Sequence, residues 1–215
     1  MNEREPFRLH APRIEAYLAG AIPPRDEILA EMERYAAERD FPIVGPQVGR
    51  LLALLAGLIR AERVFELGSG FGYSAYWLCR ALGPGGRVIA TDGREENAAR
   101  AREFFGRAGL ADRLEFRVGE ARDVLRRTPG PFDLILVDID KAQYPEAFDL
   151  AVPRLRPGGL LIADNMLRDG RVLETPPDEG TAGVLAYTRK AMEHPDLWTV
   201  ILPVRDGVGV SWRRA

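Results

Sequence analysis

The 215-residue chain has one cysteine, two histidines and no long hydrophobic run. The single cysteine, Cys79, excludes an intrachain disulfide, and its apolar helical setting favours a packed thiol over a reactive one. No apolar stretch approaches the roughly 20 residues that cross a bilayer, and residues 1–8 are polar and do not open a secretory signal. We therefore expect a cytoplasmic protein with no membrane partner.

The chain also lacks a strong charge of either sign. Its 30 Lys and Arg side chains and 32 Asp and Glu side chains leave a net charge of −2. Without a basic field to attract a polyanion, nucleic acid is not an expected partner. The length fits one domain with a sizeable core, and no linker, repeat or low-complexity segment divides it. The sequence therefore predicts a single domain over residues 1–215.

Three glycines at alternate positions interrupt residues 64–74, V-F-E-L-G-S-G-F-G-Y-S. An apolar run typical of a buried strand precedes them, and a predicted helix over residues 73–82 follows. Glycines let a ligand approach the backbone, and a helix N-terminus offers free N–H groups, so this stretch predicts a nucleotide-cofactor site. The spacing is one residue shorter than the dinucleotide pattern G-x-G-x-x-G.

Strand-like and helix-like segments alternate along the chain. The predicted strands cover residues 64–67, 87–91, 114–118, 132–138, 160–163, 198–204 and 208–212. The predicted helices cover residues 14–18, 26–39, 48–60, 73–82, 95–108, 121–127, 144–155 and 181–193. Strands separated by helices indicate a parallel sheet in a doubly wound α/β fold, and the Asp-Gly turn before the last strand predicts an antiparallel C-terminal hairpin.

Polar residues follow several predicted strands, where open α/β sheets bind ligands. Asp92, twenty-four positions after Gly68, ends the second strand and is suited to ribose hydroxyls. Asp138, Asp164 and Asn165 end the fourth and fifth strands and offer three hard oxygen donors, which suit Mg²⁺. Zinc would favour His or Cys, which lie outside these motifs.

A lysine, Lys141, lies three residues after Asp138. In a partly desolvated cleft beside a dication, a lysine gives up its proton more readily and can serve as a general base. We expect Lys141 to be the catalytic residue if the three oxygen donors hold a cation.

These motifs resemble the class I S-adenosylmethionine-dependent O-methyltransferases of the catechol and caffeoyl-CoA type. The similarity runs from about residue 44 to the C-terminus, through E-L-G-S-G-F-G-Y-S, V-D-I-D-K, A-D-N-M-L-R-D-G-R-V and P-V-R-D-G-V-G-V. The pairing of V-D-x-D-K with D-N is its most specific part. The resemblance implies a Rossmann-like, doubly wound, seven-stranded sheet whose last strand is antiparallel. It also implies that the helical segment 1–45 contributes to the substrate mouth.

The resemblance assigns roles to individual residues. Glu66 would hold the methionine amino group of the cofactor, Ser74 and the backbone near Val44 its carboxylate, Asp92 the ribose and Ala121 the adenine. The implied cofactor-binding set is Val44, Glu66, Gly68, Ser69, Gly70, Gly72, Tyr73, Ser74, Asp92, Gly93, Glu120, Ala121 and Asp138. The implied metal ligands are Asp138, Asp164 and Asn165, and the implied base is Lys141.

We therefore expect a Mg²⁺-dependent enzyme that methylates a hydroxyl of a small catechol-like or caffeoyl-like aromatic diol. One alternative is a non-catalytic relative that binds the cofactor and regulates a partner. A second is a nicotinamide-dependent dehydrogenase, for which Asp92 is suitable but the glycine spacing, Glu66 and the lack of a Tyr-x-x-x-Lys pair are not. The apolar helix 48–60 and the apolar C-terminal strands predict a homodimer.

Overall fold

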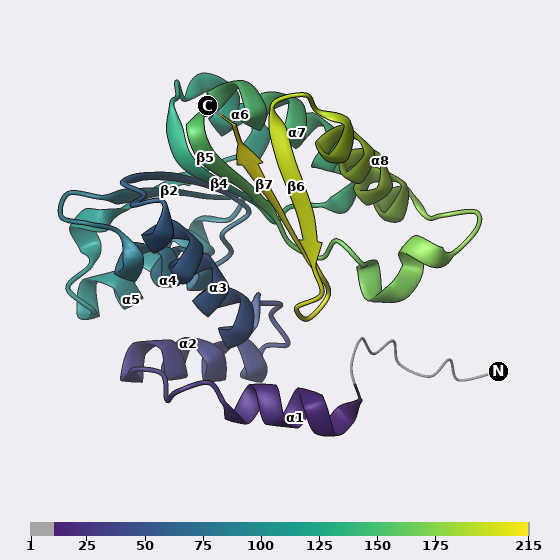
Figure 1. Ribbon diagram of the computed structural model, residues 1–215. Helices are drawn as coiled ribbons and strands as arrows, with labels where there is room; N and C mark the ends of the chain where they lie inside the picture. The colour runs from purple at the N-terminus through teal and green to yellow at the C-terminus, as the bar shows by residue number, and fades with distance from the viewer. Residues whose placement is uncertain (1–10, 215) are drawn as a thin grey trace.

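The computed structural model of the protein describes residues 11–214 and is built on one sheet. Its strands are Arg63–Leu67 (β1), Arg87–Asp92 (β2), Leu114–Val118 (β3), Phe132–Val137 (β4), Leu155–Ala163 (β5), Leu197–Leu202 (β6) and Val208–Arg213 (β7). The seven strands lie in the order β3-β2-β1-β4-β5-β7-β6 (Figure 1). Strands β1 to β5 pair in parallel, whereas β7 is antiparallel to both β5 and β6. The predicted doubly wound, mostly parallel sheet with an antiparallel hairpin is confirmed.

Helices cover both faces of the sheet. The first face carries Glu27–Glu38 (α2), Gly45–Leu58 (α3), Tyr73–Ala81 (α4) and Glu95–Arg107 (α5), with Pro12–Gly20 (α1) outside them (Figure 1). The second face carries Ala121–Arg127 (α6), Tyr144–Ala151 (α7) and Glu179–Glu193 (α8). Short 3₁₀ helices span Ala111–Arg113, Lys141–Gln143, Val152–Arg154 and Arg168–Leu173. Within residues 11–214, no helix has both the length and the apolar character needed to cross a membrane.

The strands are apolar on both sides because both sides are covered. In β1, Val64 faces the cluster under α2 to α5, whereas Phe65 and Leu67 face the cluster under α6 to α8. In β4, Leu134 joins the first cluster and Ile135 the second. Continuous apolar runs are the pattern expected of buried parallel strands.

The order in which strands are added changes at β1. Strands β2 and β3 lie on one side of it, and β4 and β5 lie on the other. At this switch point the first residue after β1, Gly68, has a φ of +84°. A Cβ atom there would lie 2.1 Å from the carbonyl oxygen of Asp138, the first residue after β4. Only glycine permits this approach, which brings the ends of β1 and β4 together at the place where such folds bind ligands.

The largest shift of a predicted boundary lies between α7 and β5. The helix predicted over residues 144–155 ends at Ala151, and β5 begins at Leu155 and continues through Pro157 to Ala163. The register of β5 against β4 is irregular at the start, where Phe132 pairs with Leu155 and Leu134 with Leu160. Leu155 continues the helical spacing of apolar residues in the sequence. In the structure it pairs with Phe132 of β4 and is therefore extended. The spacing of residues along the chain does not indicate such pairing between distant segments.

A partly buried carboxylate at the opposite end of the sheet connects three segments. Asp133, on β4, accepts hydrogen bonds from the backbone N–H groups of Glu62 (2.9 Å) and Arg63 (2.7 Å), and from the Arg156 guanidinium. Arg156 also donates to the carbonyl oxygen of Ile59 at 3.1 Å. Burial alone would raise the pKa of the Asp133 carboxyl, but Arg156 and the two N–H groups outweigh it and hold the pKa below its usual value.

We expect Asp133→Ala to lower the free energy of unfolding by about 2–3 kcal/mol, because two backbone donors and a guanidinium lose their acceptor. Denaturant unfolding followed by circular dichroism measures this loss. The matched control is Asp149→Ala, which removes an exposed ion pair with Lys190 and is expected to cost less than about 1 kcal/mol. Equal losses in the two variants would contradict the assigned role of Asp133.

Candidate functional site

A cavity of about 890 Å³ opens at the carboxyl ends of the parallel strands. The loop after β1, the segment before α3 and the ends of β2 to β5 line it. All but two of the residues predicted from the sequence face this cavity: Val44, Gly68, Ser69, Gly70, Tyr73, Ser74, Asp92, Gly93, Glu120, Ala121, Asp138, Lys141, Asp164 and Asn165. The fold therefore brings together at one surface predicted residues that are up to 121 positions apart in the sequence.

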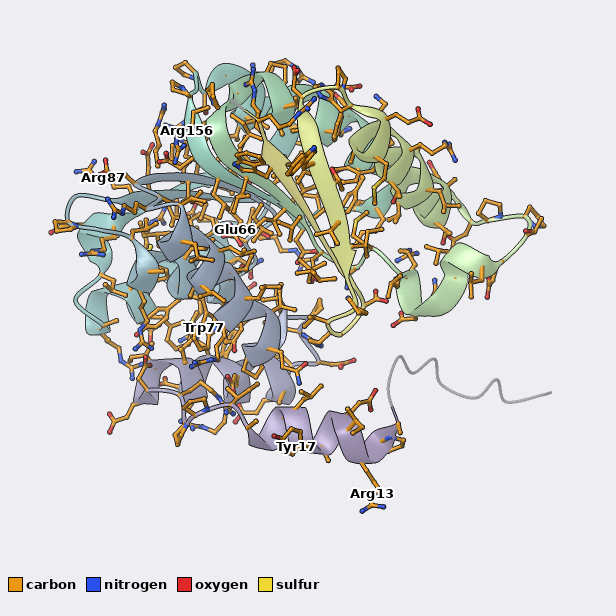
Figure 2. The ribbon with its side chains drawn as sticks, viewed as in Figure 1. Arg13, Tyr17, Glu66, Trp77, Arg87 and Arg156 are labelled. Carbon is orange, nitrogen blue, oxygen red and sulfur yellow. The ribbon has the colours of Figure 1, made fainter. Side chains whose placement is uncertain are left out.

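Glu66, one of the two exceptions, lies behind the cavity wall. Figure 2 shows it inside the molecule beside the sheet, and none of its surface is exposed. Its carboxylate accepts hydrogen bonds from the hydroxyls of Ser69 (2.7 Å) and Ser74, which do line the cavity. Burial raises the pKa of the Glu66 carboxyl to about 7, the two serines oppose the shift, and the nearby Asp138 carboxylate adds to it.

Gly72, the other exception, starts the helix that follows the glycine loop. It has a φ of +89° and stands at the N-cap position of α4. Its N–H donates to the Ser69 carbonyl oxygen at 2.8 Å, which closes the loop over residues 69–72. Gly72 therefore shapes the cavity wall without facing the cavity.

The N-terminal helices are attached to this wall through a tyrosine. The Tyr73 hydroxyl donates to the Glu33 carboxylate at 2.8 Å, and Glu33 is also bonded by Arg25. The aromatic ring of Phe41 lies against Gly70, where a Cβ atom would come within 2.8 Å of it. Glu33 and Phe41 also line the cavity, and no motif in the sequence indicated them.

Two acidic side chains at the ends of β2 and β3, both on the cavity wall, also organise the local backbone. Asp92 Oδ1 accepts hydrogen bonds from the Arg94 N–H at 2.8 Å and from the Asn97 side chain at 2.9 Å. Glu120 caps α6 by accepting from the Asp123 N–H at 3.1 Å. Both carboxylates are therefore fixed in orientation at the cavity edge.

Asp138, Lys141, Asp164 and Asn165 line the part of the cavity at the ends of β4 and β5. Lys141 Nζ lies 2.8 Å from Asp138 Oδ1. Asp164 is 5% exposed, and burial together with the neighbouring Asp138 raises the pKa of its carboxyl to about 7. In residues 11–214 no three Asp, Glu, His or Cys side chains gather in a metal-binding arrangement. Among these four side chains, two carboxylates and one amide offer oxygen donors.

A fully buried tyrosine fixes the two strand ends that carry these carboxylates. The Tyr144 hydroxyl donates to the carbonyl oxygens of Asp164 at 2.8 Å and Val137 at 3.2 Å. The two carbonyl groups belong to neighbouring strands. Tyr144 was not among the predicted site residues, because its hydroxyl bonds to backbone oxygens, which no side-chain motif indicates.

A second cavity of about 970 Å³ adjoins the first. The side chains that line both are Ile43, Asp169, Arg205 and Asp206. Helix α1, the start of α3 and the turn between β6 and β7 form its walls. The Arg-Asp-Gly turn was visible in the sequence as a hairpin turn, but its position beside the cavity was not.

Comparisons with known proteins show which family the chain resembles. A protein-family model described as O-methyltransferase matches residues 21–214. Catechol O-methyltransferase of Niastella koreensis is 38% identical over 167 residues, which cover 75% of this chain and 76% of the relative. Caffeoyl-CoA O-methyltransferase 1 of Eucalyptus globulus is 31% identical over 212 residues, which cover 91% of this chain and 86% of that protein.

The fold has counterparts among solved structures as well. An O-methyltransferase from Bacillus cereus, solved in complex with SAH, superposes with a TM-score of 0.86 at 32% sequence identity. The match covers 94% of this chain and 97% of that structure. The family model spans nearly all of the described residues, and the fold and the sequence agree with it. The chain belongs to the O-methyltransferase family.

Proposed function

We propose that the enzyme transfers a methyl group from S-adenosylmethionine to a hydroxyl of a small catechol-like or caffeoyl-like aromatic diol, with the help of a divalent cation. One observation carries the proposal. The Asp138, Lys141 and Asp164 side chains line the same cavity as the glycine loop that begins at Gly68. The relatives named above support it, since SAH, S-adenosylhomocysteine, is what S-adenosylmethionine becomes after it has given up its methyl group.

In this proposal the methionine end of S-adenosylmethionine lies against the loop after β1. Gly68 allows close approach, and Ser74 and the backbone near Val44 bind the carboxylate. Glu66, directly behind the serines, supplies the negative charge that complements the ammonium group. Asp92 binds the ribose hydroxyls. The remaining proposed contacts are Ser69, Gly70, Gly72, Tyr73, Gly93, Glu120, Ala121 and Asp138, with the adenine beside Ala121.

A pH dependence of cofactor binding follows from the buried Glu66. Its pKa of about 7 keeps the carboxyl protonated in the free protein below neutral pH, and an ammonium group placed beside it favours the ionised form. Binding is therefore coupled to proton loss. We expect the Kd for S-adenosylmethionine, measured by calorimetry, to fall as pH rises from 5.5 to 7, by up to about tenfold for each step of one in pH, and to level off above pH 7.

Glu66→Gln is the control, because it keeps the shape of the side chain and removes its titration. The variant should bind S-adenosylmethionine more weakly, with a Kd that changes little between pH 5.5 and 7. The same pH dependence in the variant and the wild type would exclude Glu66 as its source.

Asp138, Asp164 and Asn165 are the proposed cation ligands. Carboxylate and amide oxygens are the donors that Mg²⁺ prefers, and a binding mode with few protein ligands leaves positions for water and a diol. Burial and, after it, the neighbouring Asp138 carboxylate raise the pKa of the Asp164 carboxyl, and a cation bound here would compensate both negative charges. When bound, the cation lowers the pKa of the acceptor hydroxyl and fixes the direction of its oxygen.

Lys141 is the proposed general base. Its Nζ is held by Asp138, and its side chain is only 14% exposed, so it is positioned and largely shielded from bulk water. As a neutral amine, Nζ accepts the proton of the acceptor hydroxyl and becomes an ammonium group. The acceptor oxygen then forms a bond to the methyl carbon while the bond between that carbon and sulfur breaks. Holding the two reactants in contact within one cavity supplies much of the rate gain.

We expect Asp164→Ala to lower turnover of a catechol substrate by at least about 100-fold while the Kd for S-adenosylmethionine changes little, because the side chain serves the cation and not the cofactor. A methyl-transfer assay and calorimetry measure the two quantities separately. Wild-type turnover should stop with EDTA and return when Mg²⁺ is added.

Asp140→Ala is the matched control for this experiment. Asp140 lines the same cavity, but its carboxylate caps the next turn by accepting from the Ala142 N–H at 3.0 Å. This variant should keep EDTA-sensitive turnover. If Asp164→Ala loses cofactor binding and turnover together, Asp164 is a structural residue.

We also propose that residues 1–215 form one domain and that the helical segment 1–45 contributes to the substrate mouth. Residues 1–10 of that segment lie outside the described residues. Helix α1 supports the proposal, since it lines the second cavity and buries none of its own residues. Figure 2 shows Tyr17 on this outlying helix, where 71% of the side chain is exposed. An acceptor that extends beyond the first cavity would give α1 a partner to pack against.

A homodimer is the third part of the proposal. Helix α3 leaves Leu54 and Leu58 exposed, and β6 leaves Trp198 and Val200 exposed. Trp198 packs edge-to-face on Trp212 with ring centroids 5.8 Å apart. Leu197 and Ile201 of β6 pack on the cluster under α6 to α8. Trp198 and Val200 alternate with them along the strand and therefore point to the sheet face that carries α3. A second copy of the chain would cover this apolar face.

Light scattering should give a mass twice that of one chain. We expect Leu58→Asp to reduce it to the mass of one chain, because Leu58 is 70% exposed and a charge there would be buried only in the dimer. Leu173→Asp, at an exposed leucine in the 3₁₀ helix Arg168–Leu173, should leave the dimer intact. A wild-type protein with the mass of one chain would contradict the proposal.

A further inference from the structure

Helix α8 packs closely against the 3₁₀ turn Lys141–Gln143, which carries the proposed base. A Cβ atom at the buried Gly183 of this helix would lie 2.1 Å from the Lys141 carbonyl oxygen and 2.9 Å from Ala142 Cα. Both are backbone atoms, so they can move away only if the whole turn moves. The glycine at position 183 therefore sets the distance between the helix and the turn.

A glycine inside a helix has a cost. It destabilises the helix by roughly 0.5–1 kcal/mol relative to alanine, because its backbone loses more freedom on folding. Gly183 is the fifth of the 15 residues of α8 and thus lies inside the helix. By contrast, Gly106 in α5 is exposed, and an added Cβ atom there would meet open space among the described residues. The contact with the turn is what requires a glycine at position 183.

The helix is held at its start and along its inner side, so it cannot yield to the turn. Asp178 caps it by accepting a hydrogen bond from the Thr181 N–H at 2.6 Å. Further along, the fully buried ring of Tyr187 contacts the rings of Tyr144 and Phe148, whose centroids are 5.6 and 5.3 Å away. A side chain added at position 183 would therefore displace the turn and not the helix.

The position of the turn decides where the Lys141 amine lies. Lys141 Nζ is 2.8 Å from Asp138 Oδ1 and 5.3 Å from the centroid of the Tyr144 ring. Asp138 follows β4 directly and Tyr144 is fully buried, so the sheet and the core fix them. A shift of the turn would move Nζ relative to both, and a misplacement of about 1 Å in a site can cost about 100-fold in rate.

We infer that Gly183 is a positioning residue for the methyl transfer: by leaving room for the Lys141 carbonyl group, it lets α8 hold the turn where Nζ meets the acceptor hydroxyl. Gly183 does not line the cavity and acts only through Lys141. The inference rests on the proposed function, because that function makes Lys141 the general base.

Two acceptors that differ in their need for a base provide the test. Catechol must give up a proton to react, whereas the nitro group of 4-nitrocatechol makes its hydroxyl acidic enough to be largely ionised at pH 8. We expect Gly183→Ala to lower kcat for catechol about 10- to 100-fold and kcat for 4-nitrocatechol less than about threefold, each relative to the wild type with the same acceptor. A loss of stability alone would affect both acceptors equally.

Gly183→Ala should still bind the ligands of the site, because the change lies outside the cavity. We expect the Kd for S-adenosylmethionine, from calorimetry, and the Kd for Mn²⁺, from the electron paramagnetic resonance signal of the free ion, to stay within about threefold of the wild type. The control is Gly106→Ala, which makes the same exchange in a helix where a methyl group has room. It should leave kcat unchanged for both acceptors.

A second variant decides the matter if Gly183→Ala does not fold. Gly180 is partly exposed and lies three residues earlier, on the same face of α8. A Cβ atom there would be 3.5 Å from Lys141 Cβ, at ordinary contact distance. The further methyl groups of Gly180→Val would press on the Lys141 side chain. We expect kcat to fall about tenfold for catechol and less than about threefold for 4-nitrocatechol.

Lys141→Met separates the inference from the proposed function. It removes the base and should lower kcat for catechol at least about 100-fold, but kcat for 4-nitrocatechol less than about tenfold. An equal loss for the two acceptors, or no loss, would overturn Lys141 as the base and the inference with it. If Lys141→Met distinguishes the acceptors but the folded glycine variants do not, the inference alone is overturned, and Gly183 serves only the packing of the helix.

Discussion

The close approach of Gly68 to the backbone of Asp138 is the constraint on which the site depends. The Asp138 N–H donates to the Leu67 carbonyl oxygen at 2.9 Å, which extends the pairing of β1 and β4 to the last residue of each strand. Because no side chain fits at Gly68, the glycine loop and the segment that carries Asp138 and Lys141 meet directly. A cofactor bound to the first segment is thereby brought to the chemical groups of the second.

Two acids at this junction are buried at a cost to stability. Glu66 and Asp164 both have pKa values raised to about 7, and burial is the largest cause in each case. Raising a pKa by one corresponds to a free-energy difference of about 1.4 kcal/mol between the two protonation states. A fold under selection for stability alone has little reason to bury such groups beside one cavity, whereas a site that binds positively charged groups has a direct use for them.

The sequence predicted the features that repeat locally or lie at strand ends. Alternating apolar segments predicted the sheet, and the position of Asp138, Asp164 and Asn165 after their strands predicted that they would meet. Contacts between distant segments could not be predicted in this way. The bond from Tyr73 to Glu33 and the position of Glu66 behind the cavity wall both depend on side-chain directions, which residue spacing does not specify.

The direction of the last strand explains how the C-terminal hairpin reaches the site. Strand β7 is antiparallel to β5, with Gly209 opposite Ala163 and Trp212 opposite Leu160. The start of β7 therefore lies at the carboxyl end of β5, and the turn before it arrives beside Asp164. A parallel strand in the same place would begin at the opposite edge of the sheet, and its preceding turn would lie far from the cavity. The antiparallel hairpin is thus what allows Asp206 to contact the loop that follows Asn165.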